Sequence, residues 1–247
     1  MTFNFDRLKI HLRNHILPAV FFQWRAKFYK IHDADLYRPT FQPWRDKKSL
    51  FHKHYREIRN HTLLGLEGAW VLYNLAQQAL ELRGDFIEAG VYRGGSARIL
   101  WQVLKAEASA KELYLLDTFE GMPATDKKRD LHKERDFMDT SLETVSAFVG
   151  KNERINYVQG LIPQSFINLK SDVSFAFAHI DLDIYESILN ACEYIYPKMK
   201  PGGFMVFDDY GVPSCPGARV AIDKFFADKP EIPLVLHTGQ AIVFKIE

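Results

Sequence analysis

The chain has 247 residues, and its 32 Lys and Arg against 31 Asp and Glu leave a formal net charge of +1. Hydrophobic residues at 47% and charged residues at 26% are ordinary globular values, which exclude a disordered or collagen-like chain. No run approaches the roughly 18 apolar residues that a membrane-spanning helix needs, and no signal-peptide pattern or disulfide framework is found, so we expect a cytoplasmic protein.

The first 60 residues differ from the rest in charge. They carry 13 Lys and Arg against 5 Asp and Glu, a net charge of +8, interleaved with aromatic residues, whereas residues 61–247 have a net charge of −7. Helical patterning extends over about 5–30, and 33–50 resembles an extended connector with two prolines. We therefore predict a basic N-terminal helical extension over 1–60, acting as a cap, and a main domain over 61–247.

Residues 61–247 alternate between helical and strand patterns. Helices are predicted over 66–82, 94–108, 141–149, 185–198 and 219–227. Strands are predicted over 86–91, 113–116, 155–158, 174–180 and 204–207, the last after a turn at 201–203, with a final antiparallel pair over 234–236 and 241–246. The alternation favours an α/β fold, in which a mostly parallel sheet has helices on both faces and binds its ligands at the carboxyl ends of the strands.

The loop after the first predicted strand is rich in glycine, with Gly90, Gly94 and Gly95 between Glu88 and Ser96. Missing side chains let a ligand approach this strand-to-helix turn. The loop is not the dinucleotide fingerprint, and it has no P-loop lysine. An acid at the strand end favours a cationic or hydroxyl-bearing ligand over a phosphate.

Acidic residues follow the later strands. Asp117 stands where nucleotide-binding α/β folds place an acid on ribose hydroxyls. Asp181 ends the fourth predicted strand, and Asp208 and Asp209 end the fifth. Three carboxylates at adjacent strand ends would repel one another unless a cation neutralised them, and oxygen ligands suit Mg²⁺, Mn²⁺ or Ca²⁺ rather than zinc. Asp183, two residues before a predicted helix, is interpreted as its N-cap.

Two histidines and one cysteine are further candidates. His132, in the polar stretch 127–136, is a candidate active-site base, with a solvated loop histidine as the alternative. His179 lies inside the apolar fourth strand and is interpreted as a hydrogen-bonded core histidine. Cys215 adjoins the paired acids in a stiff segment, 213–217, that can shape a substrate pocket, but no histidine partner can be assigned to it as a nucleophile.

Four ordered blocks resemble the macrocin O-methyltransferase family, which comprises metal-dependent S-adenosylmethionine enzymes of the Rossmann-like class. The blocks are FIEAGVYRGGS (86–96), LDTFEGMP (116–123), IDLDIYES (180–187) and PGGFMVFDDY (201–210). The resemblance covers about 61–247 and implies a Rossmann-like class I methyltransferase sheet, mostly parallel with an antiparallel terminal strand. The 124–140 region, where the acceptor would bind, departs from the antibiotic-tailoring members of the family.

The resemblance also implies roles for individual residues. Asp181, Asp208 and Asp209 are the implied ligands of Mg²⁺ (or Mn²⁺), and Asp181 and His132 are the candidates for the catalytic base. The residues implied to contact S-adenosylmethionine are Thr62, Glu88, Ala89, Gly90, Val91, Tyr92, Gly94, Gly95, Ser96, Asp117, Thr118, Phe119, Gly121, Gly160 and Asp181.

The resemblance therefore implies an S-adenosylmethionine- and Mg²⁺-dependent O-methyltransferase. Its acceptor would be a hydroxyl of a sugar, glycoside or sugar-nucleotide-like molecule, which can be anionic. The alternatives are a catechol-type enzyme with an aromatic acceptor, or a binding protein whose basic N-terminus contacts nucleic acid or a membrane on a methyltransferase scaffold. We expect a homo-oligomer, no nucleic acid because the body is acidic, and an N-terminus compatible with peripheral membrane contact.

Overall fold

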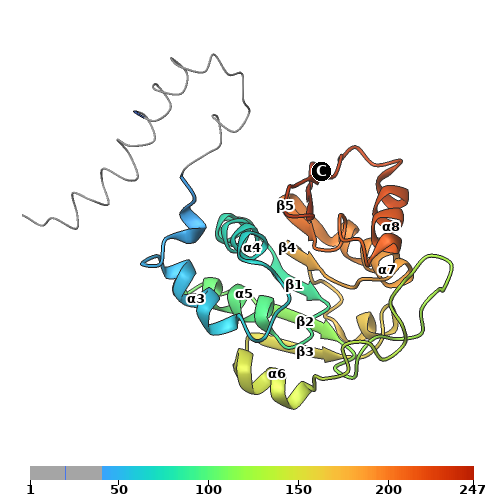
Figure 1. Cartoon of the computed structure of the whole chain (residues 1–247), viewed down its shortest axis with the longest axis horizontal. Coiled ribbons are helices and arrows are strands. Elements are labelled where there is room, and N and C mark those ends of the chain that lie inside the picture. The colour runs from blue at the N-terminus through green and yellow to red at the C-terminus, as the bar shows by residue number, and fades with distance from the viewer. Residues whose placement is uncertain (1–19, 21–40) are drawn as a thin grey trace, which may run out of the picture. The chain divides into compact units, whose positions relative to one another are not determined.

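A computed structural model of the protein describes Val20 and residues 41–247 (Figure 1). The chain divides into two units, Met1–Ser49 and Leu50–Glu247. The helix expected over 5–30 lies outside the described residues apart from Val20, and so do the part of the proposed cap before residue 41 and residues 33–40 of the connector. Over residues 41–49, the structure describes one regular element, the short 3-10 helix η3 (Pro43–Arg45).

The second unit begins earlier than the predicted boundary after residue 60. Helix α3 (Leu50–Ile58) packs against α4 (Leu66–Ala79) and α5 (Gly95–Ala106). It buries Phe51 and Ile58, and the Phe51 ring meets the edge of Trp70 at a centroid distance of 4.9 Å. These apolar contacts make α3 part of the main domain, although the basic residues around it suggested an extension.

The sheet of the second unit has seven strands in the order β3-β2-β1-β4-β5-β7-β6. Five strands are parallel: β1 (Asp85–Ala89), β2 (Leu113–Asp117), β3 (Ile155–Gln159), β4 (Phe175–Ile180) and β5 (Met199–Phe207). Strand β7 (Ala241–Phe244) runs antiparallel to both β5 and β6 (Leu234–Val235). The predicted α/β architecture, including its antiparallel terminal strand, is confirmed.

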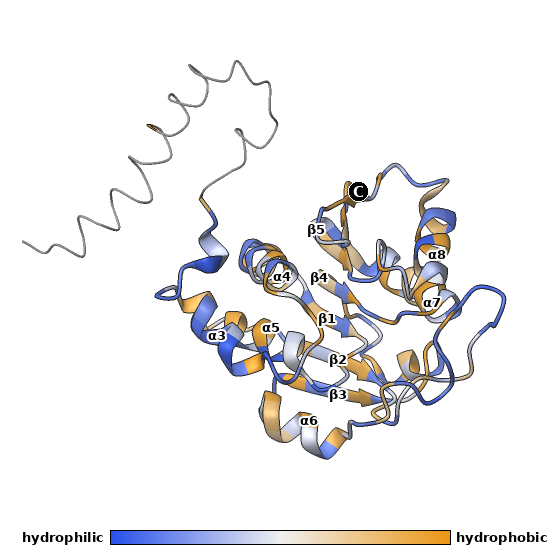
Figure 2. Ribbon diagram, viewed as in Figure 1, coloured by the Kyte–Doolittle hydropathy of each residue, from blue (hydrophilic) through white to orange (hydrophobic). Residues whose placement is uncertain are grey.

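Helices cover both faces of this sheet (Figure 1). The core on one face joins Ile87 and Ala89 of β1 to residues of α7 (Tyr185–Ile195) and α8 (Pro216–Phe226). Because side chains alternate along a strand, Phe86 and Glu88 project to the opposite face, where α4 and α5 pack on the sheet. Helix α6 (Leu142–Val149) contacts α5 and β3. Strand β4 is buried along its whole length, as expected for a central strand covered on both faces, whereas β6 at the edge of the sheet is exposed. Figure 2 shows hydrophobic and hydrophilic residues in the strands.

Two of the boundaries that differ from the prediction lie beside prolines. Strand β5 starts at Met199 and continues through the predicted turn at 201–203, where the pairing with β4 skips residues and Gly202 donates a hydrogen bond to the Lys245 carbonyl. Helix α7 ends at Ile195 and continues as the 3-10 helix η5 (Tyr196–Lys198), which contains a proline. Across the described residues, no helix is both long enough and apolar enough to cross a membrane.

Candidate functional site

One cavity of about 280 Å³ opens where the carboxyl ends of β1, β2, β4 and β5 meet. This is the edge at which open parallel sheets bind ligands. Most of the predicted site residues line it: Thr62, Gly90, Val91, Tyr92, Ser96, Asp117, Thr118, Gly121, His132, Asp181, Asp208 and Asp209. Residues far apart in the sequence therefore line one cavity, as we expected for residues that follow the carboxyl ends of parallel strands.

Six residues of the predicted cofactor set do not line the cavity: Glu88, Ala89, Gly94, Gly95, Phe119 and Gly160. Glu88, Ala89 and Phe119 are buried within the fold. Gly160 follows β3, which lies at the edge of the sheet and is separated from β1 by β2. Gly94 and Gly95 serve packing instead, because a Cβ on Gly95 would lie 2.5 Å from Cβ of Thr62.

Asp117 holds the glycine-rich loop in place. Its Oδ2 accepts hydrogen bonds from the N–H groups of Val91 at 2.7 Å and Tyr92 at 2.9 Å, and its Oδ1 accepts one from Phe119 at 2.7 Å. Carboxylate oxygens have further lone pairs, so hydroxyl groups of a ligand can still donate to them. The sequence predicted a ligand-binding role for this acid but did not indicate that it orders the loop.

Gly90 allows β1 and β4 to approach closely at the site. Its φ of +90° lies in the left-handed region that favours glycine. A Cβ at this position would lie 1.7 Å from the main-chain oxygen of Asp181. Any side chain here would therefore push Asp181 away from the loop, which explains why the strand-to-helix turn requires glycine at this position.

Asp181, Asp208 and Asp209 meet at the cavity, and one carboxylate oxygen from each lies within 4.8 Å of the others. Burial, together with the charges of Asp209 and Asp208, raises the pKa of Asp181 well above its ordinary value. The pKa of Asp209 is likewise raised well above its ordinary value by burial and by Asp183 and Asp208. A bound cation would relieve this repulsion, and an all-oxygen ligand set fits Mg²⁺.

A buried histidine connects this cluster to the first strand. His179 Nδ1 lies 2.7 Å from Glu88 Oε1, and its Nε2 lies 3.8 Å from Asp208 Oδ1. Burial alone would lower the pKa of His179, but Asp208 and Glu88 raise it well above its ordinary value. The imidazolium offsets part of the negative charge. The interpretation of His179 as a hydrogen-bonded core histidine is confirmed.

The segment 124–140 is attached to the sheet domain through a buried carboxylate. Asp130 Oδ1 accepts a hydrogen bond from the Tyr185 N–H, at the first position of α7, at 2.9 Å. The prediction that Asp183 caps this helix is wrong: the N-cap is Ile184, and Asp183 has a φ of +61° that turns its side chain toward the cavity. A capping residue supplied from more than 50 positions away leaves no local sequence signal.

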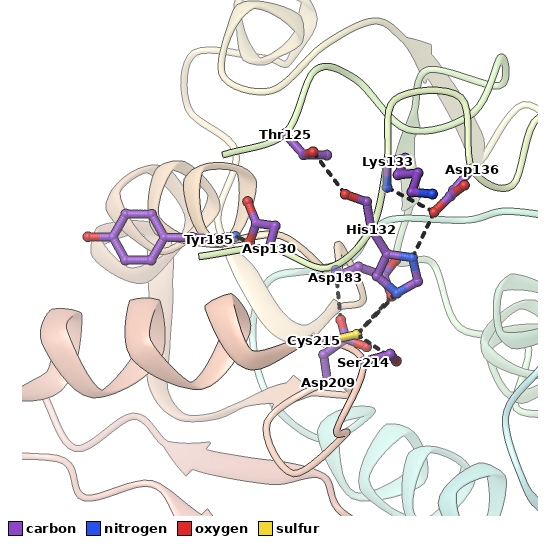
Figure 3. A network of polar contacts seen from close by, with 10 residues as sticks. All are labelled: Thr125, Asp130, His132, Lys133, Asp136, Asp183, Tyr185, Asp209, Ser214 and Cys215. Atoms are coloured by element: carbon purple, nitrogen blue, oxygen red, sulfur yellow. Dashed lines mark hydrogen bonds and ion pairs between the residues drawn. The ribbon is translucent and has the colours of Figure 1, made fainter. Parts of the chain in front are cut away.

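His132, Asp183 and Cys215 form a second polar cluster at the cavity (Figure 3). His132 Nδ1 lies 3.1 Å from Asp136 Oδ2, and its Nε2 lies 3.6 Å from both Asp183 Oδ1 and Cys215 Sγ. Cys215 therefore has a histidine neighbour, which the sequence did not reveal. Burial and the charge of Asp209 raise the pKa of the Cys215 thiol, which donates a hydrogen bond to Asp183 Oδ1 at 3.2 Å. A protonated thiol is a poor nucleophile.

The strand order, with antiparallel β7 between β5 and β6, is the fold found in solved O-methyltransferases of the Rossmann-like class. The solved structure of the O-methyltransferase NovP matches with a TM-score of 0.67 and 20% identity, covering 93% of this chain and 100% of that one. An O-methyltransferase from Bacillus cereus in complex with SAH matches with a TM-score of 0.52 and 16% identity, covering 92% and 97%. At these identities the likeness is one of fold.

The chain belongs to the macrocin-O-methyltransferase (TylF) family, whose model matches residues 58–237. A relative from Streptomyces olivaceus, 8-demethyl-8-(2,3-dimethoxy-alpha-L-rhamnosyl)-tetracenomycin-C 4'-O-methyltransferase, is 30% identical over 169 residues. That match covers 63% of this chain and 64% of the relative, so the chain spans just under two thirds of its length. The family resemblance predicted from the four sequence blocks is confirmed.

Proposed function

We propose that this chain is an S-adenosylmethionine- and Mg²⁺-dependent O-methyltransferase, and that its acceptor hydroxyl belongs to a sugar, glycoside or sugar-nucleotide-like molecule. The observation that carries the proposal is the shared cavity, in which the carboxylates of Asp181, Asp208 and Asp209 adjoin the Gly90 loop and Asp117. A methyl-donor site and a hard-cation site in one cavity suit the transfer of a methyl group to oxygen.

The donor half of the cavity fits S-adenosylmethionine, which would supply the methyl group to be transferred. Asp117 and Thr118 would accept hydrogen bonds from its ribose, and the backbone at Gly90 and Val91 would lie along it. The buried Glu88 Oε2, which has no hydrogen-bond partner among the described residues, leaves an acceptor unused beneath this loop. A Rossmann-like neighbour crystallised with SAH supports the same assignment.

The carboxylate cluster fits a divalent cation, which would supply a positive charge next to the acceptor hydroxyl. Asp181, Asp208 and Asp209 would hold it. Gln240 Nε2 donates a 2.7 Å hydrogen bond to Asp208 Oδ1, and the Asp183 N–H donates one of 2.8 Å to Asp209 Oδ2. These donors orient two of the carboxylates before any ligand binds. The carboxylates are therefore already placed to hold a cation beside the acceptor, and holding the reactants in position is a large part of catalysis.

Two side chains at the cavity can accept the proton of the acceptor hydroxyl, Asp181 and His132. Asp136 orients the His132 ring through Nδ1, which leaves Nε2 directed toward the cavity wall formed by Asp183 and Cys215. The His132→Gln variant separates the two: if His132 is the base, kcat falls with little change in acceptor KM. If Asp181 is the base, kcat is nearly unchanged.

The acceptor class is supported by the relative from Streptomyces olivaceus, which is named for methylation of a rhamnosyl-bearing molecule. A panel of sugar nucleotides, glycosides and catechols, incubated with S-adenosylmethionine and Mg²⁺, tests it by the mass gain of one methyl group. Methylation of the catechols alone would replace the sugar acceptor by an aromatic one.

The metal requirement is tested by chelation and by one substitution. Removing divalent cations should abolish turnover, and restoring Mg²⁺ should recover it. Asp181→Asn should abolish turnover and weaken Mg²⁺ binding, whereas Asp172→Asn, an exposed acid on the loop before β4, should change neither. Full activity in metal-free buffer would refute the metal role, and S-adenosylhomocysteine failing to bind in calorimetry would refute the proposed donor.

A further inference from the structure

Three side chains with different ligand atoms converge on one wall of the cavity, apart from the three-carboxylate cluster. They come from three separate segments: His132 from the stretch after β2, Asp183 from the loop after β4, and Cys215 from the residue before α8. Cys215 Sγ lies 3.2 Å from Asp183 Oδ1 and 3.6 Å from His132 Nε2, and the latter two atoms are 3.6 Å apart. Figure 3 shows the three side chains directed toward one another.

These separations match one face of a tetrahedral zinc site. Zinc binds sulfur at about 2.3 Å, imidazole nitrogen at about 2.0–2.1 Å and carboxylate oxygen at about 2.0–2.2 Å. With tetrahedral angles, such bonds place the ligand atoms about 3.3–3.6 Å from one another. The two distances of 3.6 Å from His132 Nε2 lie within about 0.3 Å of those values, and the Cys215 Sγ to Asp183 Oδ1 distance of 3.2 Å is shorter by about 0.3–0.5 Å than a zinc-bound sulfur and oxygen would be, so a small side-chain movement would complete the geometry.

The cluster also has the outer contacts of a built metal site. A histidine that binds a metal through one nitrogen usually donates its other N–H to a carboxylate. His132 Nδ1 lies 3.1 Å from Asp136 Oδ2, and that oxygen accepts a second hydrogen bond from the Lys133 N–H at 2.9 Å. The ring is therefore held with Nε2 directed at Cys215 and Asp183, and Asp136 favours the tautomer that leaves Nε2 free to bind.

The chemistry of this cluster differs from that of Asp181, Asp208 and Asp209. Three carboxylates favour Mg²⁺, whereas a thiolate, an imidazole and a carboxylate favour Zn²⁺ or Co²⁺ over Mg²⁺. All three residues of the new cluster line the cavity, so a fourth coordination position would face the bound acceptor. An open fourth position is the arrangement of catalytic rather than structural zinc sites.

We propose that His132, Asp183 and Cys215 form a site for Zn²⁺, distinct from the proposed Mg²⁺ site and open to the acceptor cavity. On binding, the Cys215 thiol loses its proton to solvent and the thiolate bonds to the metal. The occupied site has a consequence for the reaction, because Nε2 of His132 is then unable to accept a proton. Zn²⁺ would leave Asp181 as the base of the cavity.

The test uses Co²⁺ as a spectroscopic substitute for Zn²⁺ in the full chain after treatment with a chelator. We expect one tightly bound Co²⁺ per chain with a thiolate-to-cobalt charge-transfer band, displaced by Zn²⁺ and retained in excess Mg²⁺. Cys215→Ser and His132→Gln should lose the band. Cys192→Ser, which alters the other buried cysteine, and Asp208→Asn, which alters the carboxylate cluster, should keep it.

Two further measurements separate a metal site from a folding defect. Asp136→Asn should weaken Co²⁺ binding about 10–100-fold while keeping the band. In the folded, unmodified chain, Zn²⁺ should slow the alkylation of Cys215. In a denatured control, Zn²⁺ should not slow the alkylation of Cys192. No charge-transfer band in the wild-type chain, or a band that survives Cys215→Ser, overturns the proposal. Because neither readout involves methyl transfer, a chain that binds Co²⁺ but methylates nothing would refute only the proposed function.

Discussion

Replacing Asp130 by alanine should loosen the acceptor side of the cavity and leave the donor side intact. Asp130 is 6% exposed, and its carboxylate accepts hydrogen bonds from the N–H groups of Tyr185 at 2.9 Å and Asp126 at 3.1 Å. It also lies against the first turn of α8, where a Cβ on Gly217 would lie 2.1 Å from Asp130 Oδ1. One side chain thus joins the segment 124–140 to two helices.

The expected loss of stability follows from these contacts. Removing a helix-capping side chain costs about 1 kcal/mol, and up to about 2 kcal/mol in proteins. The N–H of Tyr185 is buried, so water cannot replace the lost acceptor, which adds about 1 kcal/mol. We expect Asp130→Ala to lower the free energy of unfolding by about 2 kcal/mol, which for a domain of this size lowers Tm by about 4–8 °C.

Urea denaturation and steady-state kinetics check this prediction together. The acceptor KM should rise, whereas the Kd for S-adenosylhomocysteine should stay within a factor of about two because Asp117 and Gly90 are untouched. Asp130→Asn keeps one acceptor oxygen and should lose about 1 kcal/mol or less, since Asn caps helices about as well as Asp. The reasoning is refuted if Asp130→Ala is no less stable than Glu153→Ala, which alters an exposed acid, and has the same acceptor KM.

Two further substitutions test the fold around the site. Burial would raise the pKa of Glu231, but hydrogen bonds from Tyr196, the Ile246 N–H and Lys245 outweigh it and lower that pKa from 4.5 to about 2. The ionised carboxylate therefore adds about 3 kcal/mol to the free energy of unfolding above pH 4.5, and this contribution is lost as the pH falls toward 2. We expect Glu231→Gln to be less stable than wild type at pH 7, and the two free energies of unfolding to converge in acid. Gly90→Ala should lose about 3 kcal/mol or more by its strained φ and its clash with Asp181, whereas Gly65→Ala, with open space around its Cβ, should lose under about 1 kcal/mol by the same denaturation assay.

The part of the cavity at the strand ends was predictable because it is built from local sequence. Gly90, Asp117, Asp181 and Asp208 each lie within a residue of a strand end, and buried strands are recognisable from their apolar runs. Once the strands are known to be parallel and adjacent, their carboxyl ends must meet, and no side-chain detail is needed. Gly160 also follows a strand but does not line the cavity, because β3 lies at the edge of the sheet, and the sequence does not reveal the strand order.

The acceptor half was not predictable for the opposite reason. His132 reaches the cavity only because contacts distant in sequence fold the segment back, among them the bond from Tyr185 to Asp130 and that from Met122 to the Asp136 carbonyl. Asp183 was misread as a helix cap because its spacing from α7 fits one. A single sequence contains no pattern that shows that another segment supplies the cap, or that the Asp183 side chain lines the cavity instead.

If the cavity binds donor and acceptor as proposed, this division would let one fold keep its methyl donor while its acceptor changes. The donor loop is fixed by backbone constraints, since Gly90 permits only hydrogen at Cα and Asp117 binds two N–H groups of the loop. The acceptor wall depends on side chains of a mostly polar segment anchored at Asp130, and a change there need not disturb the strands (Figure 2). Residues that distinguish this chain's substrate should therefore be sought between 122 and 140 and around Cys215, and exchanges in that wall should alter acceptor choice while leaving donor affinity unchanged.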